Sequence, residues 1–259
     1  MGFQFPPNSN GAAGFNRGEA IITPDQLLQR YFWGVDLTDK QGNKIPPEVL
    51  QHQINAAVSY IEHKLDIIIF PTQFVEEYDM RSVDYMEFNF LQLKKRPLSS
   101  VEKMRAKYPN NQTLIEFPKE WFVLEKEGAQ LQLAPVEGTF NGLIITQGGS
   151  YVPLLYGTKD SWPHMFEVTY TAGFCNDQIP VILNEMIGLQ AAISMFMILR
   201  DTIYGPLAGE NTSIDGAATG RQLGPTGPYG ARIEAYQKKL DELLKVAHKY
   251  YNGFAFTVP

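Results

Sequence analysis

The sequence predicts an α+β fold in which a helical core of about four helices is interrupted by a β-rich insertion. Apolar residues recur every three or four positions near both ends of the chain, which is the period of one face of an α-helix. Between about residues 73 and 171 the apolar residues alternate instead, which is the period of half-buried strands. Hydrophobic residues make up 44% of the 259 positions and charged residues 19%, so the chain has enough apolar material for a buried core.

The first two helices are predicted from capping residues and prolines. Thr23 can cap a helix that has Pro24 at its first position, which predicts a short helix over about residues 24–33. Pro46 and Pro47 then open a longer helix. Its predicted buried face consists of residues spaced three or four apart: Leu50, Ile54, Ala57, Val58, Ile61 and Leu65.

Segments with a period of two predict several strands in the middle of the chain. Residues 121–125 and 130–133 lie on either side of Lys126-Glu127-Gly128, whose composition is typical of a hairpin turn. Further strands are predicted at residues 87–90, 143–146 and 166–170. The single cysteine, Cys175, follows this region and is expected to be a small, buried or half-buried side chain.

Two further helices are predicted after the insertion. Residues 180–204 are apolar on most sides, which indicates a helix buried by several neighbours. Its uncharged stretch, residues 186–199, is shorter than the about twenty residues that a membrane crossing needs, so we expect a core helix and no membrane segment. The last helix, over about residues 229–251, is amphipathic, with an apolar stripe at helical spacing: Ile233, Tyr236, Leu240, Leu243, Leu244 and Ala247.

Glycine and proline gather in segments that these periodic patterns leave out. Residues 1–22 form a predicted flexible N-terminal arm. Residues 205–228, a long glycine-rich loop before the last helix, hold six glycines and three prolines with no apolar period. A connection of this length inside a compact domain is uncommon. It is either a floppy surface insertion or a loop that orders against a neighbouring subunit.

The tail after the last helix also has two possible interpretations, contact with a partner or contact with its own chain. Phe254, Phe256 and Val258 alternate with smaller residues, a pattern that suits strand addition or docking on a partner. The alternative is a tail that folds back onto its own core. The predicted domains are the arm (1–22), the helical core (23–72 and 172–251), the β-rich insertion (73–171) and the C-terminal tail (252–259).

Composition and motifs exclude many enzymatic and nucleic-acid-reading functions. A net charge of −6 with no strongly basic stretch argues against a duplex-DNA reader that neutralises phosphates. One cysteine excludes an internal disulfide framework and a multi-cysteine zinc site, and no histidine has a second metal ligand nearby in sequence. The sequence contains no phosphate-binding loop, dinucleotide fingerprint, zinc-protease motif or serine-hydrolase elbow. We therefore predict no catalytic residue, no metal and no cofactor.

One alternative places chemistry in the β-rich insertion. Trp121, Phe122, Tyr151 and Trp162 could furnish an aromatic platform for a sugar, in a hydrolase or a carbohydrate-binding module. Glycoside hydrolysis needs a pair of carboxylates at a controlled spacing, and the sequence shows no such pair.

Several short motifs follow one another along the chain. The most specific is a loop, Ser213-Ile214-Asp215-Gly216, followed by Tyr229-Gly230-Ala231-Arg232-Ile233 at the opening of the last helix. The others are Thr23-Pro24-Asp25-Gln26-Leu27-Leu28, Ala56-Ala57-Val58, Ile61-Glu62, Arg96-Pro97-Leu98-Ser99-Ser100-Val101, and Val168-Thr169-Tyr170-Thr171-Ala172-Gly173-Phe174 before Ile179-Pro180. Taken in their order along the chain, from residue 23 to residue 233, these motifs resemble those of tailed-bacteriophage head–tail connector (adaptor) proteins. The resemblance covers about residues 23–70 and 165–251 and leaves out the arm and most of the insertion.

The resemblance implies a structural virion protein and no enzyme. Connector proteins of this family form a ring, commonly of twelve copies, beneath the portal, where the ring extends the DNA channel and receives the next neck or tail component. The chain would be made in the host cytoplasm and would act in the virion neck, between head and tail. Genomic DNA would pass through without specific binding, and a negative net charge suits such a channel. A tail-completion or other neck protein with a related helical core is the alternative within the virion.

The expected contacts of such a protein lie in the loop, at the start of the last helix and in the tail. The partners would be further copies of this chain, the portal protein and the tail or neck protein below. The residues expected to contact the portal or a neighbouring subunit are Ser213, Ile214, Asp215, Gly216, Tyr229, Arg232, Phe254, Phe256 and Val258.

Overall fold

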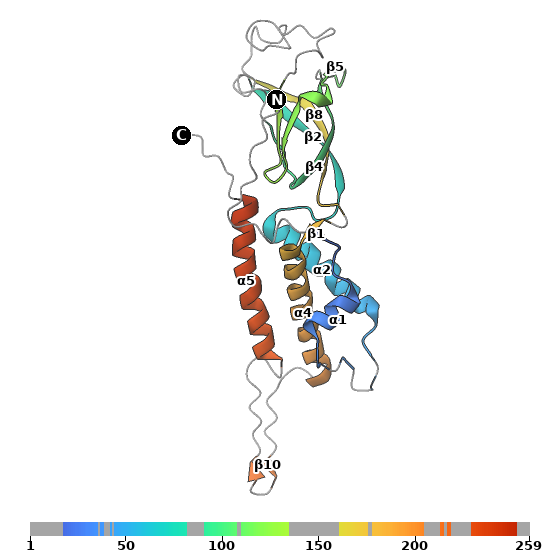
Figure 1. Ribbon diagram of the computed structural model, residues 1–259, viewed down its shortest axis with the longest axis vertical. Helices are drawn as coiled ribbons and strands as arrows, with labels where there is room; N and C mark the ends of the chain where they lie inside the picture. Colours follow the sequence, from blue (N-terminus) through green and yellow to red (C-terminus); the bar gives the residue numbers. More distant parts are fainter. Residues whose placement is uncertain are drawn as a thin grey trace. The chain divides into compact units, whose positions relative to one another are not determined.

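The computed structural model describes residues 18–35, 37–38, 42, 44–81, 91–107, 110–134, 161–175, 178–204, 213–214, 217–218 and 229–252. Within these residues the chain has four α-helices and antiparallel β-sheets, so the predicted α+β class is confirmed (Figure 1). Two compact units can be distinguished, one made of the described parts of Met1–Leu65 and Asp177–Tyr250, the other of those of Asp66–Asn176 and Tyr251–Pro259. Compactness does not show that a unit folds independently, which is what defines a domain, so the domain boundaries expected from the sequence stay a prediction.

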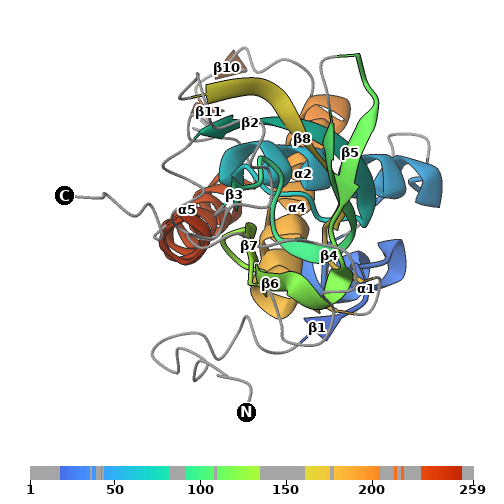
Figure 2. The same ribbon diagram turned by 90° about the horizontal axis from the view of Figure 1, so that it is seen from above.

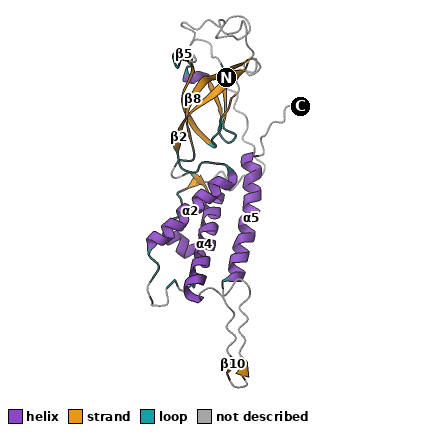
Figure 3. Ribbon diagram, turned by 180° about the vertical axis from the view of Figure 1, so that it is seen from behind, coloured by secondary structure: helices purple, strands orange, loops and turns teal. Residues whose placement is uncertain are grey.

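The first unit contains the helices. Their bounds are Pro24–Tyr31 for α1, Pro47–Leu65 for α2, Val181–Tyr204 for α4 and Gly230–Asn252 for α5 (Figure 3, purple). All four lie where the period of the apolar residues predicts a helix. Helix α4 contacts both α1 and α2, and α1 also contacts α2. The bundle arrangement expected for the four helices stays a prediction.

Local sequence explains where α1 begins and which face α2 buries. Thr23 and Gln26 form a capping box, in which Thr23 Oγ1 accepts a hydrogen bond from the Gln26 amide at 3.3 Å and Gln26 Oε1 accepts one from the Thr23 amide at 3.1 Å. Helix α1 ends at Tyr31, slightly before the expected end. The six residues of the predicted face of α2, from Leu50 to Leu65, are all buried, and none is more than 3% exposed.

Helix α4 is buried along most of its length. Among the described helices it alone is long and apolar enough, over Val181–Leu199, to cross a membrane by length and composition. The core helix of a folded protein meets the same two criteria, and 61% of the apolar window is buried inside the chain itself. Met197 departs from the predicted burial, because 40% of its surface is exposed near the end of the helix.

The N-terminal arm is shorter than the sequence predicts. Gly18–Glu19 forms strand β1, which pairs antiparallel with β9, Ile179–Pro180. The Ile22 side chain is 1% exposed, and its amide donates a hydrogen bond to Asn184 Oδ1 at 2.8 Å. Because residues 18–19 pair with β9 and the Ile22 side chain is buried, the expectation of a flexible arm is wrong for residues 18–22. Residues 1–17 lie outside the described residues.

The second unit contains two antiparallel sheets (Figure 2). The larger has the order β2-β8-β4-β5, with bounds Thr72–Arg81, Ser161–Ala172, Leu98–Lys107 and Thr113–Glu116. The smaller has the order β3-β7-β6, with bounds Leu91–Gln92, Gln130–Leu133 and Phe122–Glu125, and the short 3-10 helix η1, Lys119–Trp121, precedes β6. Side chains from both sheets share one core, which includes Trp121, Phe166 and Tyr170.

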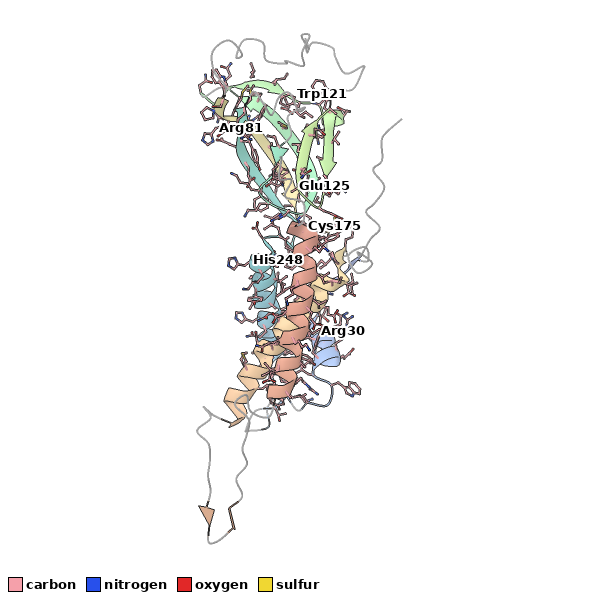
Figure 4. The ribbon with its side chains drawn as sticks, turned by 90° about the vertical axis from the view of Figure 1, so that its left-hand side faces the viewer. Arg30, Arg81, Trp121, Glu125, Cys175 and His248 are labelled. Carbon is pink, nitrogen blue, oxygen red and sulfur yellow. The ribbon has the colours of Figure 1, made fainter. Side chains whose placement is uncertain are left out.

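The predicted strands can be compared with this unit one by one. The hairpin is confirmed, because β6 and β7 pair across Lys126-Glu127-Gly128, and residues 166–170 lie within β8 as expected. The predicted strands 87–90 and 143–146 lie outside the described residues. Cys175 is exposed, so its expected burial is wrong; it lies three residues past the end of β8 and after Gly173, whose φ is positive (Figure 4).

Candidate interaction surfaces

The glycine-rich segment before α5 contains a short two-stranded pairing. Strand β10, Ser213–Ile214 (Figure 1), pairs antiparallel with β11, Ala217–Ala218. In this register Ile214 lies opposite Ala217. This register leaves Asp215 and Gly216 between the strands, and Asp-Gly is a sequence that two-residue hairpin turns favour. Within the predicted loop 205–228 the described residues therefore include one short strand pair, and the choice between a floppy insertion and a loop that orders against a neighbouring subunit stays a prediction.

An aromatic cluster packs the start of α5 against α4. The Phe196 ring lies 5.1 Å from that of Tyr229, 6.1 Å from that of Tyr236 and 4.7 Å from that of Phe32, measured between centroids. The Arg232 guanidinium lies 5.7 Å from the centre of the Phe196 ring, within cation–π range. Tyr229 and Arg232 are therefore engaged within their own unit, and a partner contact through them stays a prediction.

Tyr31 connects α1 to α4 and α5. Its hydroxyl donates a hydrogen bond to the Glu185 carbonyl oxygen at 3.4 Å, and the Tyr236 hydroxyl donates one to the Tyr31 carbonyl oxygen at 3.1 Å. The two tyrosine rings meet edge to face at 5.9 Å. Burial, and then the charge of Glu185, raise the pKa of Tyr31, so the hydroxyl stays protonated and can donate. Gly188 provides the space, because a Cβ atom there would lie 2.5 Å from Tyr31 Cε2.

An apolar pocket of about 330 Å³ lies between the end of α1 and the start of α2. Its polar members, Thr38 and Lys44, face each other in an isolated antiparallel bridge. Trp33, which lies between two wall residues in the sequence, leaves 82% of its surface exposed. Tryptophan is enriched among the residues that dominate binding energies, so we regard this pocket as a candidate contact surface. Its apolar walls are Leu28, Phe32, Val35, Leu37, Ile45 and Leu50.

Charged side chains from three neighbouring strands pair on the second unit. Arg105 binds Glu167 through two nitrogens, Nε to Oε1 at 2.7 Å and Nη2 to Oε2 at 2.9 Å. Lys107 Nζ lies 3.4 Å from Glu167 Oε2 and also binds Glu77. The hydrogen bond from Arg105 lowers the pKa of Glu167, and the one from Lys107 lowers the pKa of Glu77. The positive charges of Arg105 and Lys107 balance the negative charges of Glu77 and Glu167. These ion pairs connect three strands of the sheet and leave no net charge for a ligand.

A second polar group lies on the core side of the same sheet. Glu76 Oε2 accepts hydrogen bonds from the hydroxyls of Tyr170, at 2.8 Å, and of Tyr78. The two hydroxyl oxygens in turn accept hydrogen bonds from the amides of Lys95 and Lys94. Burial, and then the hydrogen bond to Glu76, raise the pKa of both tyrosines. They stay protonated and satisfy the carboxylate, which makes this group structural.

Among the described residues of the second unit, Trp121 is not available for the aromatic platform of the carbohydrate-binding alternative. Trp121, labelled in Figure 4, is 0% exposed. Phe122 and Trp162 are half-buried and pack against the same core. A sugar platform that includes Trp121 is therefore wrong, because this side chain is fully buried; Tyr151 lies outside the described residues. In the part of the chain that the structure describes, no group of three His, Cys, Asp or Glu side chains could hold a metal ion.

Sequence reasoning misses the pocket beside Trp33. Its walls come from two helices and the segment between them, and no short motif brings these residues together. The one available signal is Trp33 itself, a large aromatic residue just past the end of an amphipathic helix. Of the predicted contact residues, Ser213 and Ile214 are described by their backbone only, and five lie outside the described residues: Asp215, Gly216, Phe254, Phe256 and Val258.

Comparison with known proteins finds no protein-family model and no curated protein that matches this chain. Several solved structures are similar. The neck of an empty gene transfer agent (GTA) particle, computed with C6 symmetry, has a chain 16% identical, with a TM-score of 0.39, covering 88% of this chain and 92% of that one. The virion of a native GTA particle has a chain 15% identical, with a TM-score of 0.43 and coverage of 90% and 92%. The neck of a native GTA particle, computed with C12 symmetry, has one 18% identical, with a TM-score of 0.36 and coverage of 72% and 80%. With all three TM-scores below 0.5, this likeness assigns no role to the chain.

Proposed function

We propose that this chain is a structural neck protein of a tailed phage or a phage-like particle, where it forms a ring adaptor between the portal and the next neck or tail component. One observation carries the proposal: the most specific pair of connector-like motifs lies on two distinct elements. Ser213-Ile214 is strand β10 of a hairpin, and the Tyr229 motif opens α5. A hairpin inserted between two long helices is the kind of element that reaches a neighbouring molecule.

The polar chemistry of the second unit supports a structural role. The paired charges around Glu167 and the tyrosines around Glu76 satisfy one another, and each group is explained by the stability of the sheet. A net charge of −6 disfavours tight contact with DNA phosphates, which suits a channel that genomic DNA passes through. We propose twelve copies in the ring from the sequence resemblance alone.

Co-assembly with the portal of the same particle tests the proposal. We expect the purified chain to be monomeric or weakly associating by sedimentation, and to form a closed ring on the portal that electron microscopy resolves. A chain that bound completed tails and ignored the portal would support the tail-completion alternative. Binding to neither would overturn the proposal.

The C-terminal tail offers a more specific test. Deleting residues 254–259 should weaken docking on the portal while far-UV circular dichroism, which reports the helices, stays unchanged. A replacement of Phe254 and Phe256 by serine is the matched control, because it keeps the chain length and removes only the apolar side chains. Undiminished affinity of both variants for the portal would show that the tail takes no part in docking.

A further inference from the structure

We propose that two copies of the free chain associate by exchanging Trp33, so that the indole of each copy enters the apolar pocket of the other. Both parts of this contact belong to the described residues of the first unit: the pocket between the end of α1 and the start of α2, and the indole beside it. The inference goes beyond the proposed ring and does not depend on it, because it concerns the chain in the absence of a portal.

A tight turn holds the Trp33 side chain away from its own pocket. The Val35 amide donates a hydrogen bond to the Phe32 carbonyl oxygen at 2.9 Å, so Trp33 and Gly34 are the two central residues of a β-turn. Gly34 has a φ of +75°, and a positive φ at this place in a turn favours glycine. Phe32 and Val35, the ends of the turn, both line the pocket, whereas Trp33 is 82% exposed. The indole therefore stands at the rim of the pocket and does not fill it.

Trp33 is more exposed than any other large apolar side chain that the structure describes. The next, Val75, is 62% exposed and lies within strand β2. Tryptophan buries a large apolar surface when it is inserted into a partner, and it is enriched among the residues that dominate binding energies. Among the described residues, Trp33 is therefore the side chain best suited to enter a pocket on another molecule.

The chemistry of the pocket suits an indole. Six of its eight lining residues are apolar, and a volume of about 330 Å³ is near the lower end of the range of ligand sites, so it suits one large side chain better than a whole helix. The two polar members, Thr38 and Lys44, lie opposite each other in their isolated bridge. A threonine hydroxyl can accept a hydrogen bond from an indole N–H, and a lysine ammonium is attracted to the face of an indole. An indole thus offers an apolar body, a donor and a π face to the groups that the pocket presents.

The position of Trp33 beside the pocket favours a two-fold pair of chains. Because the indole and the pocket lie side by side on one surface, a two-fold axis between them would place each indole in the pocket of the other copy. Such an isologous contact uses both exposed indoles and both pockets at once. A ring built from this contact would instead need the indole and the pocket on opposite sides of the subunit.

The area of the contact predicts a weak dimer. A buried tryptophan covers about 150–250 Å² of its own surface and about as much of the pocket wall, so two reciprocal contacts bury about 600–1,000 Å² in total. Stable interfaces of standard size bury about 1,200–2,000 Å². We therefore expect dimers that form at high protein concentration and dissociate on dilution.

Sedimentation equilibrium of the full chain over a range of concentrations tests the contact. The average mass of the unaltered chain should rise with concentration from that of a monomer towards that of a dimer. Trp33→Ala should weaken this association by about tenfold or more, because it removes both inserted indoles. Tyr60→Ala, which removes another exposed aromatic side chain on α2, is the matched control and should associate normally. Far-UV circular dichroism should be the same for all three chains.

A variant of the pocket separates insertion into the pocket from any other contact of Trp33. Leu37→Lys places a charge on a half-buried wall residue and keeps the indole, so it should also weaken association by about tenfold or more. In a mixture with Trp33→Ala, a mixed dimer retains one of the two contacts, since the indole of the Leu37→Lys chain enters the intact pocket of the other. The mixture should therefore associate more strongly than either variant alone, which would also show that Leu37→Lys is folded.

Photochemical cross-linking identifies the partner of the indole directly. A chain with the photoreactive aromatic residue p-benzoylphenylalanine in place of Trp33 is mixed with an isotopically heavy, unaltered chain and irradiated. We expect cross-links from position 33 to heavy peptides that contain the pocket residues Val35, Leu37 or Ile45. Cross-links confined to light peptides would place this side chain in the pocket of its own chain and overturn the proposal.

The other outcomes also decide the matter. A mass that stays monomeric at every concentration, or that rises equally for the unaltered chain and for Trp33→Ala, would refute the contact. Loss of association in Trp33→Ala but not in Leu37→Lys would show that the indole binds elsewhere, which refutes it as well. The proposed function is tested separately, because a ring of Trp33→Ala chains on the portal would leave the adaptor standing, and an unaltered chain that dimerises but forms no ring would leave the exchange of Trp33 standing.

Discussion

Replacing Gly188 by alanine sets two opposing effects against each other in the middle of α4. Alanine has a higher helix propensity than glycine and would stabilise the helix by about 1 kcal/mol if nothing else changed. At this position, however, the new Cβ would lie 2.5 Å from Tyr31 Cε2 and 2.6 Å from its hydroxyl oxygen. Both distances are far below van der Waals contact, so the tyrosine ring would have to move.

The structure shows what that movement would lose. The ring would give up its edge-to-face contact with Tyr236 at 5.9 Å and its hydrogen bond to the Glu185 carbonyl oxygen. An aromatic pair contributes about 0.5–1.5 kcal/mol and a hydrogen bond of this kind about 0.5–1.5 kcal/mol, and overpacking adds about 1–3 kcal/mol. Even after the gain in helix propensity, we expect Gly188→Ala to lower the free energy of unfolding by about 1–5 kcal/mol.

Urea unfolding followed by far-UV circular dichroism measures this change, and a second background provides the control. In a Tyr31→Ala chain the ring is absent, so Gly188→Ala should stabilise by up to about 1 kcal/mol, the propensity gain alone. The reasoning requires opposite signs in the two backgrounds. If Gly188→Ala stabilised the chain equally with and without the Tyr31 ring, the packing of α1 on α4 described above would be refuted.

Two further predictions concern the second unit, with Gly34 of the first unit as a comparison. Gly173→Ala should lower the free energy of unfolding by about 2–4 kcal/mol, because its φ of +113° disfavours a side chain and the new Cβ would lie 2.5 Å from the Phe70 carbonyl oxygen. Gly34→Ala is the comparison, since Gly34 also has a positive φ but open space around it. It should lower the free energy of unfolding by only about 1–2 kcal/mol, and urea titration measures both changes. Glu167→Gln should lower stability at neutral pH, because the lowered pKa of Glu167 beside Arg105 means that the folded state favours the ionised carboxylate. This deficit should shrink as the pH falls below 4.5 and vanish below the lowered pKa, when the parent is protonated too. A deficit that is the same at neutral and acid pH would contradict the role of the charge.

Much of the helical architecture could be predicted from local sequence. The face of α2 from Leu50 to Leu65 is buried as its spacing predicts, and Thr23 caps α1 as its position before Pro24 predicts. The β6–β7 hairpin is also local, since its strands and turn occupy consecutive residues. These features depend on interactions between residues that are close in sequence, so periodicity and turn chemistry are enough to find them.

Features that depend on distant residues could not be found in this way. Ile22 is held by Asn184, and Met197 stays partly exposed although its helix is apolar on most sides. The predicted burial of Cys175 is wrong, since this side chain lies past the end of β8 and is exposed. Periodicity reports how apolar a position is, but burial also requires a neighbouring element to cover it.

The sequence by itself determined the α+β class, the places of the four helices and the motif order that resembles connector proteins, because propensity, capping and periodicity act over a few residues. Only the tertiary structure decided that Tyr229 and Arg232 pack on Phe196, and that an apolar pocket forms beside Trp33. Pockets and packed clusters arise when side chains distant in the chain meet, and the free energy of that meeting is set by shape and by the exclusion of water. Neither can be evaluated until the helices and strands have been placed.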